Sequence, residues 1–426
     1  MRRTFVLLCI LLGPACGSGG GGGGPAPVVF NGLGVPATPK PYAGGIPSGL
    51  PTRVGLGLGN FDLAWVNANG VAMDYRYQYL SGGVNTGAGW TTWNNPPGEF
   101  AALYMTASDG KNMIPVFDYY QLRESRPNQG SENPHSKLQT PSTMYAYYAE
   151  FKLLLQKCAA FNKTVILHVE PDFWGFVQKD AAGKPENIAV AVEVSGFPEA
   201  AGLLDNLCGF AQLLVKLRNS IAPKALIAFH ASHWGTGTDL IANNGNPTTI
   251  GTQTGDFFNA LGADFELLFH DPTDRDAGFK QYEWGDGGGS WWDNTDFNNY
   301  RTYLDTVKTV SGRRGFLWQL PLGNTKMKTC DNTRWHYQDN RVEYWLDDTP
   351  HANISAYKGA GILGYLWGPT ENYTTHYTDA NTDGVTNGGA TGTTSTVSDD
   401  DGGYWRLRAA AYYSTTSGNP GPILLP

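Results

Sequence analysis

The stretch from Thr164 to Gly175 carries the residue types best suited to acid–base chemistry. It opens with an apolar, β-branched run that is typical of a buried strand. The run ends in two carboxylates, Glu170 and Asp172, followed by Trp174. His168 and Glu170 share strand parity, so we expect both on one face. Acids at the end of a buried strand beside a flat ring predict a sugar-cleaving site; the other interpretation is a loop with solvated acids.

Short apolar runs, separated by helical patterns, must position these residues. We expect strands over Arg53–Gly59, Ala72–Tyr79, Met113–Asp118, Thr164–Glu170, Ala225–His230, Phe265–His270, Gly315–Gln319 and Ile362–Trp367. Apolar residues at helical spacing predict helices over Ser142–Phe161, Ala200–Ile221, Phe297–Val310 and Arg341–Leu346. This alternation predicts an α/β fold, a (β/α)8-type barrel with long loops at the C-terminal face of its strands.

Polar and aromatic residues recur at the predicted strand ends, which is where such barrels carry their chemistry. Asp118 ends the third strand, and Asp271 follows the sixth. Each could be structural alone, but the recurrence around the barrel favours a binding site. The candidate substrate-binding residues are Trp174, His230, His233, Trp234, Trp318, Gln319, Trp367 and Glu371.

The order of several motifs resembles the family 6 glycoside hydrolases, which are inverting cellulases. The motifs are Phe117-Asp118, Glu170-Pro171-Asp172, Ser232-His233-Trp234, Trp318-Gln-Leu-Pro321-Leu-Gly323 and Cys330-Asp331. The His-Trp segment is two residues shorter than in the family, and the last segment lacks the family's glutamate. The resemblance implies Asp172 as the general acid, Asp118 as its supporting carboxylate, and Asp331 near the position of the base.

The physical requirements of glycoside cleavage support similar roles. One group must donate a proton, and a neighbouring carboxylate can raise the donor's pKa. Glu170, Asp172 and Asp118 could form such a cluster. Gln319 stands where retaining barrel cellulases carry a glutamate, so the sequence favours inversion. We therefore expect Asp172 to face Asp271 or Asp331 at the ~6.5–9.5 Å spacing of inverting pairs.

Two other functions remain open. His230, His233, His270 and Asp271 could be ligands of a metal-dependent barrel hydrolase. Alternatively, the chain could be a non-catalytic glycan-binding protein that keeps its tryptophans as sugar platforms. For the glycosidase we expect no cofactor in catalysis.

A calcium loop is predicted near the C-terminus. Asp379, Asn381 and Asp383 have the oxygen spacing of such a loop, although position twelve is Ala390. Asp399, Asp400 and Asp401 are the alternative source of the missing carboxylate. The other interpretation is a polar insertion, rich in Gly and Thr, near residues 376–403.

The composition indicates a neutral ligand. Only 16% of residues are charged, 13% are aromatic, and the net charge is -8. No basic field exists to capture phosphates, which argues against nucleic acid. We expect a monomer whose partner is a polysaccharide, such as a β-glucan.

The first residues predict export. Arg2 and Arg3 precede an apolar run, and residues 1–16 end in Cys16, which resembles a bacterial lipoprotein signal. Ordinary cleavage near Ala15 is the alternative. Residues 17–45 then form a Gly/Pro-rich tether, and 46–426 a single barrel domain. We expect a periplasmic, surface-anchored or secreted protein. One disulfide among Cys158, Cys208 and Cys330 is possible.

Overall fold

The computed structural model describes residues 27–38, 45–60, 63–348, 350–368, 372–386, 395–415 and 420–426. Its centre is a closed barrel of eight parallel strands in sequential order, so the predicted fold class is confirmed. The last strand pairs with the first, with Gly364 opposite Gly55. The strands are β1 (Gly55–Gly59), β2 (Tyr75–Leu80), β3 (Ile114–Tyr119), β4 (Val165–Val169), β5 (Ala225–His230), β6 (Leu267–His270), β7 (Arg314–Leu320) and β8 (Ile362–Trp367).

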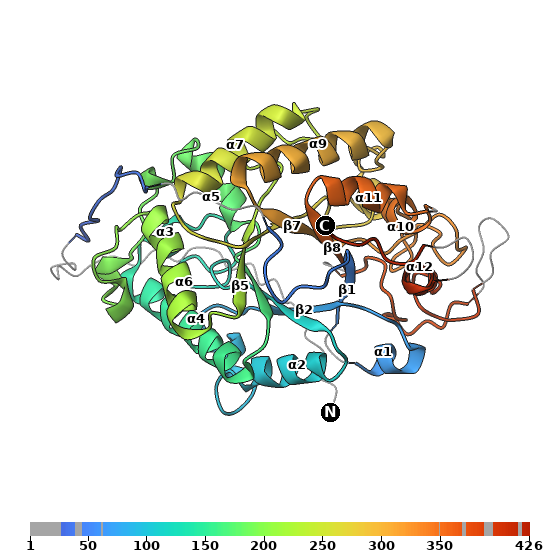
Figure 1. Ribbon diagram of the computed structural model, residues 1–426, viewed down its shortest axis with the longest axis horizontal. Coiled ribbons are helices and arrows are strands. Elements are labelled where there is room, and N and C mark those ends of the chain that lie inside the picture. Colours follow the sequence, from blue (N-terminus) through green and yellow to red (C-terminus); the bar gives the residue numbers. More distant parts are fainter. Residues whose placement is uncertain are drawn as a thin grey trace, which may run out of the picture.

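Helices surround the barrel on its outside (Figure 1). The helices are α1 (Ala64–Asn69), α2 (Glu99–Asp109), α3 (His135–Leu138), α4 (Pro141–Phe161), α5 (Phe173–Ala181), α6 (Leu207–Ile221), α7 (Pro247–Ala260), α8 (Ala277–Phe279), α9 (Asn294–Ser311), α10 (Arg341–Leu346), α11 (Ala352–Gly359) and α12 (Tyr404–Tyr413). Pro141 at the start of α4 fits the first turn, where no backbone N–H is needed. Among the described residues, we find no helix with the length and apolar character needed to cross a membrane.

Alternating strand residues form an apolar core inside the barrel, which is separate from the larger core outside it. This core contains Tyr75, Tyr77, Val116, Ile166, Leu226, Ala228, Leu267, Phe269, Phe316, Trp318, Leu363 and Leu366. The β1 glycines make room for it. A Cβ on Gly57 would lie 2.8 Å from the Tyr75 carbonyl oxygen, and one on Gly59 would lie 2.7 Å from the Tyr77 ring. Ile46, Leu50 and Leu425 pack against this core.

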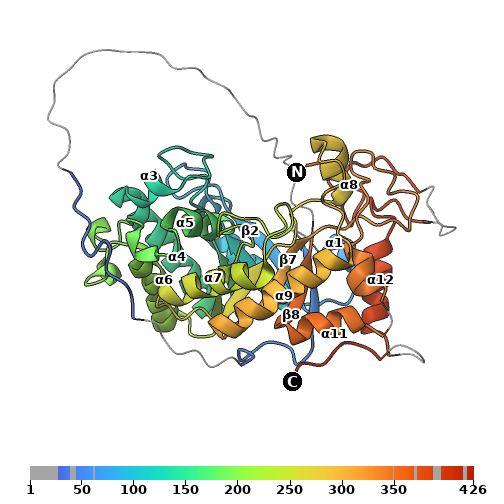
Figure 2. The same cartoon turned by 90° about the horizontal axis from the view of Figure 1, so that it is seen from above.

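The two ends of the barrel differ. Figure 2 shows α3 and α8, which follow β3 and β6, at the upper edge, and the C-terminus at the lower edge. The upper end therefore carries the loops that follow the strands, where the sequence places the candidate residues.

The segment before β1 is partly described. Asn31 N–H donates to Asp205 over 3.0 Å, and the Asn206 side chain donates to the Gly32 carbonyl over 3.0 Å. Residues 27–38 of the expected tether thus lie against the start of α6. The export segment and Cys16 fall outside the described residues. Cys158, Cys208 and Cys330 are buried free thiols, so the possible disulfide among them is not formed.

Candidate functional site

A line of buried side chains crosses the barrel beneath its upper end. Asp118 and His168 occupy paired positions of β3 and β4. Asp118 Oδ1 lies 2.8 Å from His168 Nδ1, and His168 Nε2 lies 3.0 Å from His230 Nδ1. Trp318 donates its indole N–H to Asp118 Oδ2 over 3.1 Å. All of these side chains face the interior, so the line joins β7, β3, β4 and β5.

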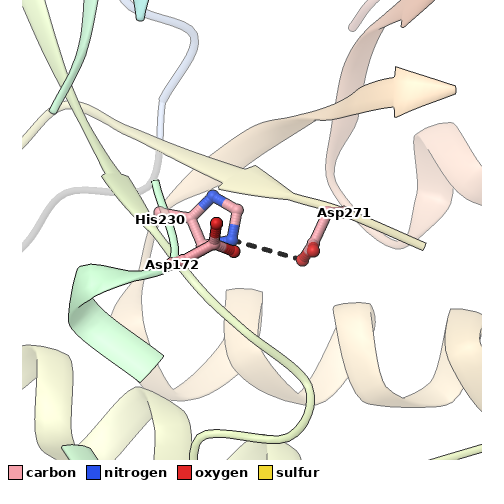
Figure 3. A group of neighbouring side chains, drawn as sticks. All are labelled: Asp172, His230 and Asp271. Carbon is pink, nitrogen blue, oxygen red and sulfur yellow. Dashed lines mark ion pairs between the residues drawn. The ribbon is translucent and has the colours of Figure 1, made fainter. Parts of the chain in front are cut away.

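This line ends at a carboxylate pair. His230 Nε2 forms an ion pair of 3.2 Å with Asp271 Oδ1. Asp172 completes a trio in which one donor atom from each residue lies within 4.8 Å of the others (Figure 3). The trio comes from three neighbouring strand ends, because Asp172 follows β4, His230 ends β5 and Asp271 follows β6.

The trio contains one carboxyl that favours its proton and one that does not. Burial raises the pKa of Asp172 to about 6; the charge of Asp271 adds to this rise and that of His230 opposes it. Burial also disfavours charge on His230 and Asp271, but their mutual attraction outweighs it. The pKa of His230 is therefore raised and that of Asp271 lowered. Groups with pKa values set apart in this way can serve as acid and base.

The same trio could hold a metal ion. Two carboxylates and one imidazole form a donor set that suits several divalent transition metals. His230 Nδ1 already contacts His168, which is the kind of support that fixes a ligand imidazole.

The backbone is unusual at three residues near the ends of β4 and β7. Glu170, Asp172 and Gln319 have φ values of 49°, 65° and 55°, in the left-handed region that non-glycine residues rarely occupy. Residues held in such conformations often cluster at functional sites. At Glu170 the positive φ also breaks the alternation of the strand, which redirects its side chain.

Glu170 therefore does not join His168 inside the barrel, and the expectation of one shared face is wrong for it. Glu170 Oε1 accepts the Gln121 N–H over 2.9 Å, and Oε2 accepts the Leu122 N–H over 3.2 Å. Burial raises its pKa to about 8. Its contacts hold the loop after β3, while its catalytic role remains a prediction.

The candidate tryptophans are mostly interior. Trp174 donates its indole N–H to the Val169 carbonyl over 2.8 Å, within the layer between strands and helices. Trp367 is buried against Trp345, and Trp318 lies inside the barrel. A fully buried ring offers no face to a sugar, so these positions do not suit the platforms expected of them. Trp234 is partly exposed and packs edge-on against Phe176.

Other aromatic groups, missed by the sequence analysis, border the trio. Tyr79 and Tyr120 are partly exposed and face Asp172, whose charge adds to the effect of burial in raising both phenol pKa values. The Gln319 amide donates to the Tyr79 hydroxyl. Tyr79 is the last residue of the second predicted strand. Its position at a strand end could have identified it as a candidate site residue.

Two further predicted residues, Asp331 and His233, lie outside the trio. Asp331 Oδ1 accepts from Thr333 N–H over 3.0 Å, within its own turn. His233 Nδ1 lies 3.6 Å from Asp239. Glu371 falls outside the described residues. None of these observations tests the roles assigned to them.

Residues of the predicted calcium loop form hydrogen bonds with one another. Asp379 accepts the backbone N–H groups of Asp383 and Gly384 over 3.0 and 3.1 Å, and Asn381 donates to Asp383. Asp383 also contacts His336 Nε2 over 3.1 Å. Calcium binding stays a prediction.

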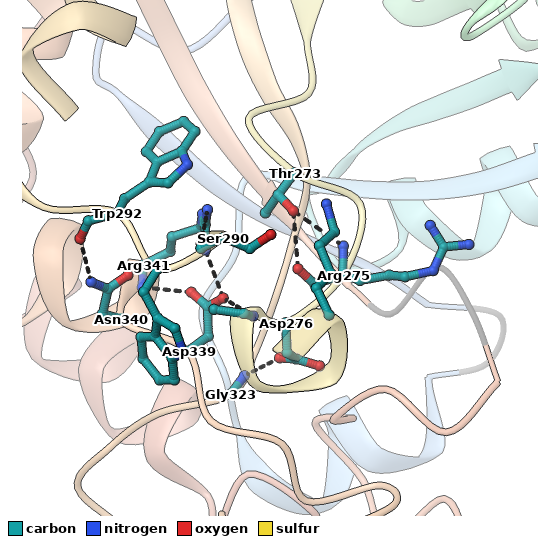
Figure 4. A network of polar contacts seen from close by, with 12 residues as sticks. Thr273, Arg275, Asp276, Ser290, Trp292, Gly323, Asp339, Asn340 and Arg341 are labelled. Carbon is teal, nitrogen blue, oxygen red and sulfur yellow. Dashed lines mark hydrogen bonds and ion pairs between the residues drawn. The ribbon is translucent and has the colours of Figure 1, made fainter. Parts of the chain in front are cut away.

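A polar network fixes the loop that carries Asp271 (Figure 4). Asp276 accepts the N–H groups of Gly323 and Thr375, each over 2.9 Å. Asp339 accepts the Ala277 N–H and an Arg341 N–H, each over 2.7 Å. These hydrogen bonds connect the segments that follow β6, β7 and β8. They hold the loop that begins at Asp271 against the rest of the barrel.

No protein family matches this sequence, and no curated protein matches it either. Several solved structures resemble the fold at low similarity. A fungal β-1,4-galactanase is 10% identical with a TM-score of 0.41, over 76% of this chain and 94% of its own. A modular family 26 endo-β-1,4-mannanase from Cellulomonas fimi is 10% identical with a TM-score of 0.42, over 76% and 67%.

A family 6 enzyme is also among the similar structures. Cellobiohydrolase II from Humicola insolens is 11% identical with a TM-score of 0.31, over 54% of this chain and 59% of its own. These values are too low to carry a function from those enzymes to this chain. The function must be argued from the site itself.

Proposed function

We propose that this protein is a glycoside hydrolase that cleaves a neutral polysaccharide by acid/base catalysis. One observation carries the proposal: Asp172 and Asp271 approach each other from different strand ends, with their pKa values shifted in opposite directions. Cleavage of a glycosidic bond needs one protonated and one ionised carboxyl group on either side of it. The barrel places this pair at its C-terminal end, where such chemistry belongs.

In this proposal Asp172 donates its proton to the leaving-group oxygen as the glycosidic bond breaks. The Asp271 carboxylate attacks the anomeric carbon, and Asp172 then takes a proton from the water that releases the sugar. Carboxylate oxygens of Asp172 and Asp271 lie within 4.8 Å of each other, which is closer than the wider spacing expected of an inverting pair. Retaining pairs lie ~5–5.5 Å apart, so this geometry favours retention. Asp172→Asn on a polysaccharide panel tests the proposal.

A cavity of about 330 Å³ supplies an aromatic surface for the polymer beyond the trio. Its lining includes Arg275 and Trp284, from the segment that begins at Asp271, and Tyr373. The Trp284 and Tyr373 side chains are 57% and 42% exposed. Flat, exposed rings beside polar groups are suited to pyranose faces.

We therefore expect Trp284→Ala to raise KM for a polysaccharide several-fold and to leave an aryl monoglycoside unaffected. Loss of one stacked ring costs about 1 kcal/mol or more. Tyr282→Ala is the matched control, because Tyr282 is 59% exposed on the same turn and does not line the cavity. Equal effects of both variants on the polymer would remove Trp284 from the binding surface.

A second candidate function is a metal-dependent hydrolase, favoured by the convergence of Asp172, His230 and Asp271. A metal bound there would lower the pKa of a bound water and present it to the substrate. The glycosidase needs no such ion. We expect dialysis against EDTA to leave glycosidase activity unchanged. Loss of activity that returns only with added Zn²⁺ or Mn²⁺ would favour the second candidate.

We also propose that the protein acts outside the cytoplasm, anchored through a lipid on Cys16. The arginines and apolar run before Cys16 support this. Metabolic labelling with a fatty-acid analogue, compared between the wild type and Cys16→Ser, tests it.

A further inference from the structure

Asp172, His230 and Asp271 meet at the ends of three neighbouring strands, with one donor atom from each within 4.8 Å of the others. We propose that this trio is also an inhibitory metal site, and that Zn²⁺ or Cu²⁺ bound there switches the glycosidase off. The inhibition rests on the proposed function, whereas the binding of the ion does not.

Two donor atoms of the trio are buried without a hydrogen-bond partner. His230 Nε2 and Asp271 Oδ1 lie 3.2 Å apart, but their contact lacks the direction of a hydrogen bond. Buried polar atoms are satisfied in nearly every native protein by protein groups, water or an ion. This pair of atoms therefore points to a group that binds both of them.

The spacing of the donors suits one ion of transition-metal size. Zn²⁺ binds imidazole nitrogen and carboxylate oxygen at about 2.0–2.2 Å, which places two ligands of a tetrahedral ion about 3.4 Å apart. The 3.2 Å between His230 Nε2 and Asp271 Oδ1 agrees with this separation. Asp172 is the third donor, and its side chain is partly exposed, so it can rotate to close the shell from the solvent side.

The His230 ring is held in the orientation that an ion needs. Its Nδ1 lies 3.0 Å from His168 Nε2, and the two rings stack with their centroids 5.1 Å apart. The Trp318 ring meets the His230 ring edge-on, with the centroids 5.7 Å apart. The ring cannot turn without breaking these contacts, so Nε2 stays directed towards the trio. An imidazole supported at its other nitrogen is the usual arrangement in metal sites.

The chemistry of the donors selects among metal ions. One imidazole and two carboxylates suit Zn²⁺ and Cu²⁺, and Cu²⁺ has the highest affinity of the divalent first-row metals for such donors. Ca²⁺ instead takes about six to eight oxygen ligands, and Mg²⁺ is bound through oxygen and keeps several waters. We therefore expect the trio to discriminate strongly against Ca²⁺ and Mg²⁺.

An ion at this position would take both carboxyl groups that the proposed mechanism uses. Asp172 bound to the ion cannot deliver a proton, and the Asp271 oxygen that holds the ion cannot attack the anomeric carbon. Glu170 and Asp331 do not stand ready to replace them. Glu170 holds the loop after β3, and Asp331 accepts a hydrogen bond within its own turn. Occupation of the trio should therefore inhibit cleavage.

Calorimetry with Zn²⁺, without substrate and after removal of metals with EDTA, tests the binding. We expect the affinity of the wild type to fall by more than about 100-fold in His230→Gln, since loss of a supporting neighbour alone costs about 10–100-fold. His135→Gln is the matched control and should bind Zn²⁺ as the wild type does. His135 forms a similar pair with Asp180, at 2.8 Å on the surface, but belongs to no group of three donors among the described residues.

Electron paramagnetic resonance gives a test that needs no variant. The wild type with one equivalent of Cu²⁺ should show coupling to a single imidazole nitrogen, so the inference stays testable even if His230→Gln does not fold. Three results would overturn it: no binding of Zn²⁺ by the wild type, equal losses of affinity in His230→Gln and His135→Gln, or a Cu²⁺ spectrum without this coupling.

The inhibition is measured on a polysaccharide that the metal-free protein cleaves. Zn²⁺ should halve the rate at the concentration that half-fills the site in calorimetry, and Ca²⁺ or Mg²⁺ at that concentration should have no effect. A rise in rate with Zn²⁺ would overturn the inference and favour the metal-dependent hydrolase. Binding of Zn²⁺ at the trio, without cleavage of any polysaccharide by the metal-free protein, would count against the proposed function alone.

Discussion

Replacement of Asp172 by Asn should lower the rate on a natural polysaccharide by about 10²–10⁴-fold, the usual contribution of a positioned acid. The amide keeps the shape of the side chain and cannot deliver a proton. Aryl glycosides with acidic phenols need little protonation to leave, so they should be cleaved nearly as fast as by the wild type. Steady-state kinetics on both substrate classes would measure this difference.

The pH profile gives the same prediction a second readout. Asp172 must hold its proton to act, and its pKa is about 6. The rate on a polysaccharide should therefore fall as pH rises through about 6, and this limb should disappear in Asp172→Asn. Glu132→Gln is the matched control, because it removes a negative charge that faces Asp172 and leaves the proton donor in place. Near-wild-type rates of Asp172→Asn on the polymer would assign the acid elsewhere.

The barrel could be predicted from the sequence because its signals are local. The first and last residues of each predicted strand lie within three residues of those observed. The predictions Ala225–His230 and Ile362–Trp367 match the observed strands at both ends. The glycines at alternate positions of β1 leave space inside the barrel, because Tyr75 and Tyr77 occupy the volume that their side chains would take.

The site was harder to predict because it depends on backbone turns and packing that sequence periodicity does not encode. A positive φ at Glu170 turns its carboxylate towards the loop after β3. Trp174 and Trp367 follow strands as a sugar platform would, but both rings pack beneath the helices. The separation of Asp172 and Asp271 depends on loops whose course is set by distant partners such as Asp339.

The exposed rings that we propose as a sugar-binding surface had no local signal in the sequence. Trp284 lies 13 positions beyond Asp271 in a long loop, with no strand pattern around it. It lines a cavity with Tyr373, which comes from the segment after β8. Only the closure of the barrel brings these segments together, so their association is a property of the fold.

Replacement of Asp271 should be the most damaging single change, because it removes the proposed nucleophile. We expect Asp271→Ala to lower the rate by about 10³-fold or more on activated and natural substrates alike, since the first bond cannot form in either case. This pattern differs from that of Asp172→Asn, which should spare activated substrates. Asp274→Ala, on the same loop, is the matched control for loss of a carboxylate.

The stereochemistry of the product decides between one and two displacements. If Asp271 attacks the sugar, each step inverts the anomeric carbon, and the first product released keeps the configuration of the substrate. Proton NMR of the initial products should therefore show the retained anomer. A fluorinated substrate that slows the second step should leave a sugar attached to Asp271, detectable by mass spectrometry of peptides. Initial release of the inverted anomer would instead show that Asp271, or a more distant carboxylate such as Asp331, activates water, as the sequence alone first suggested.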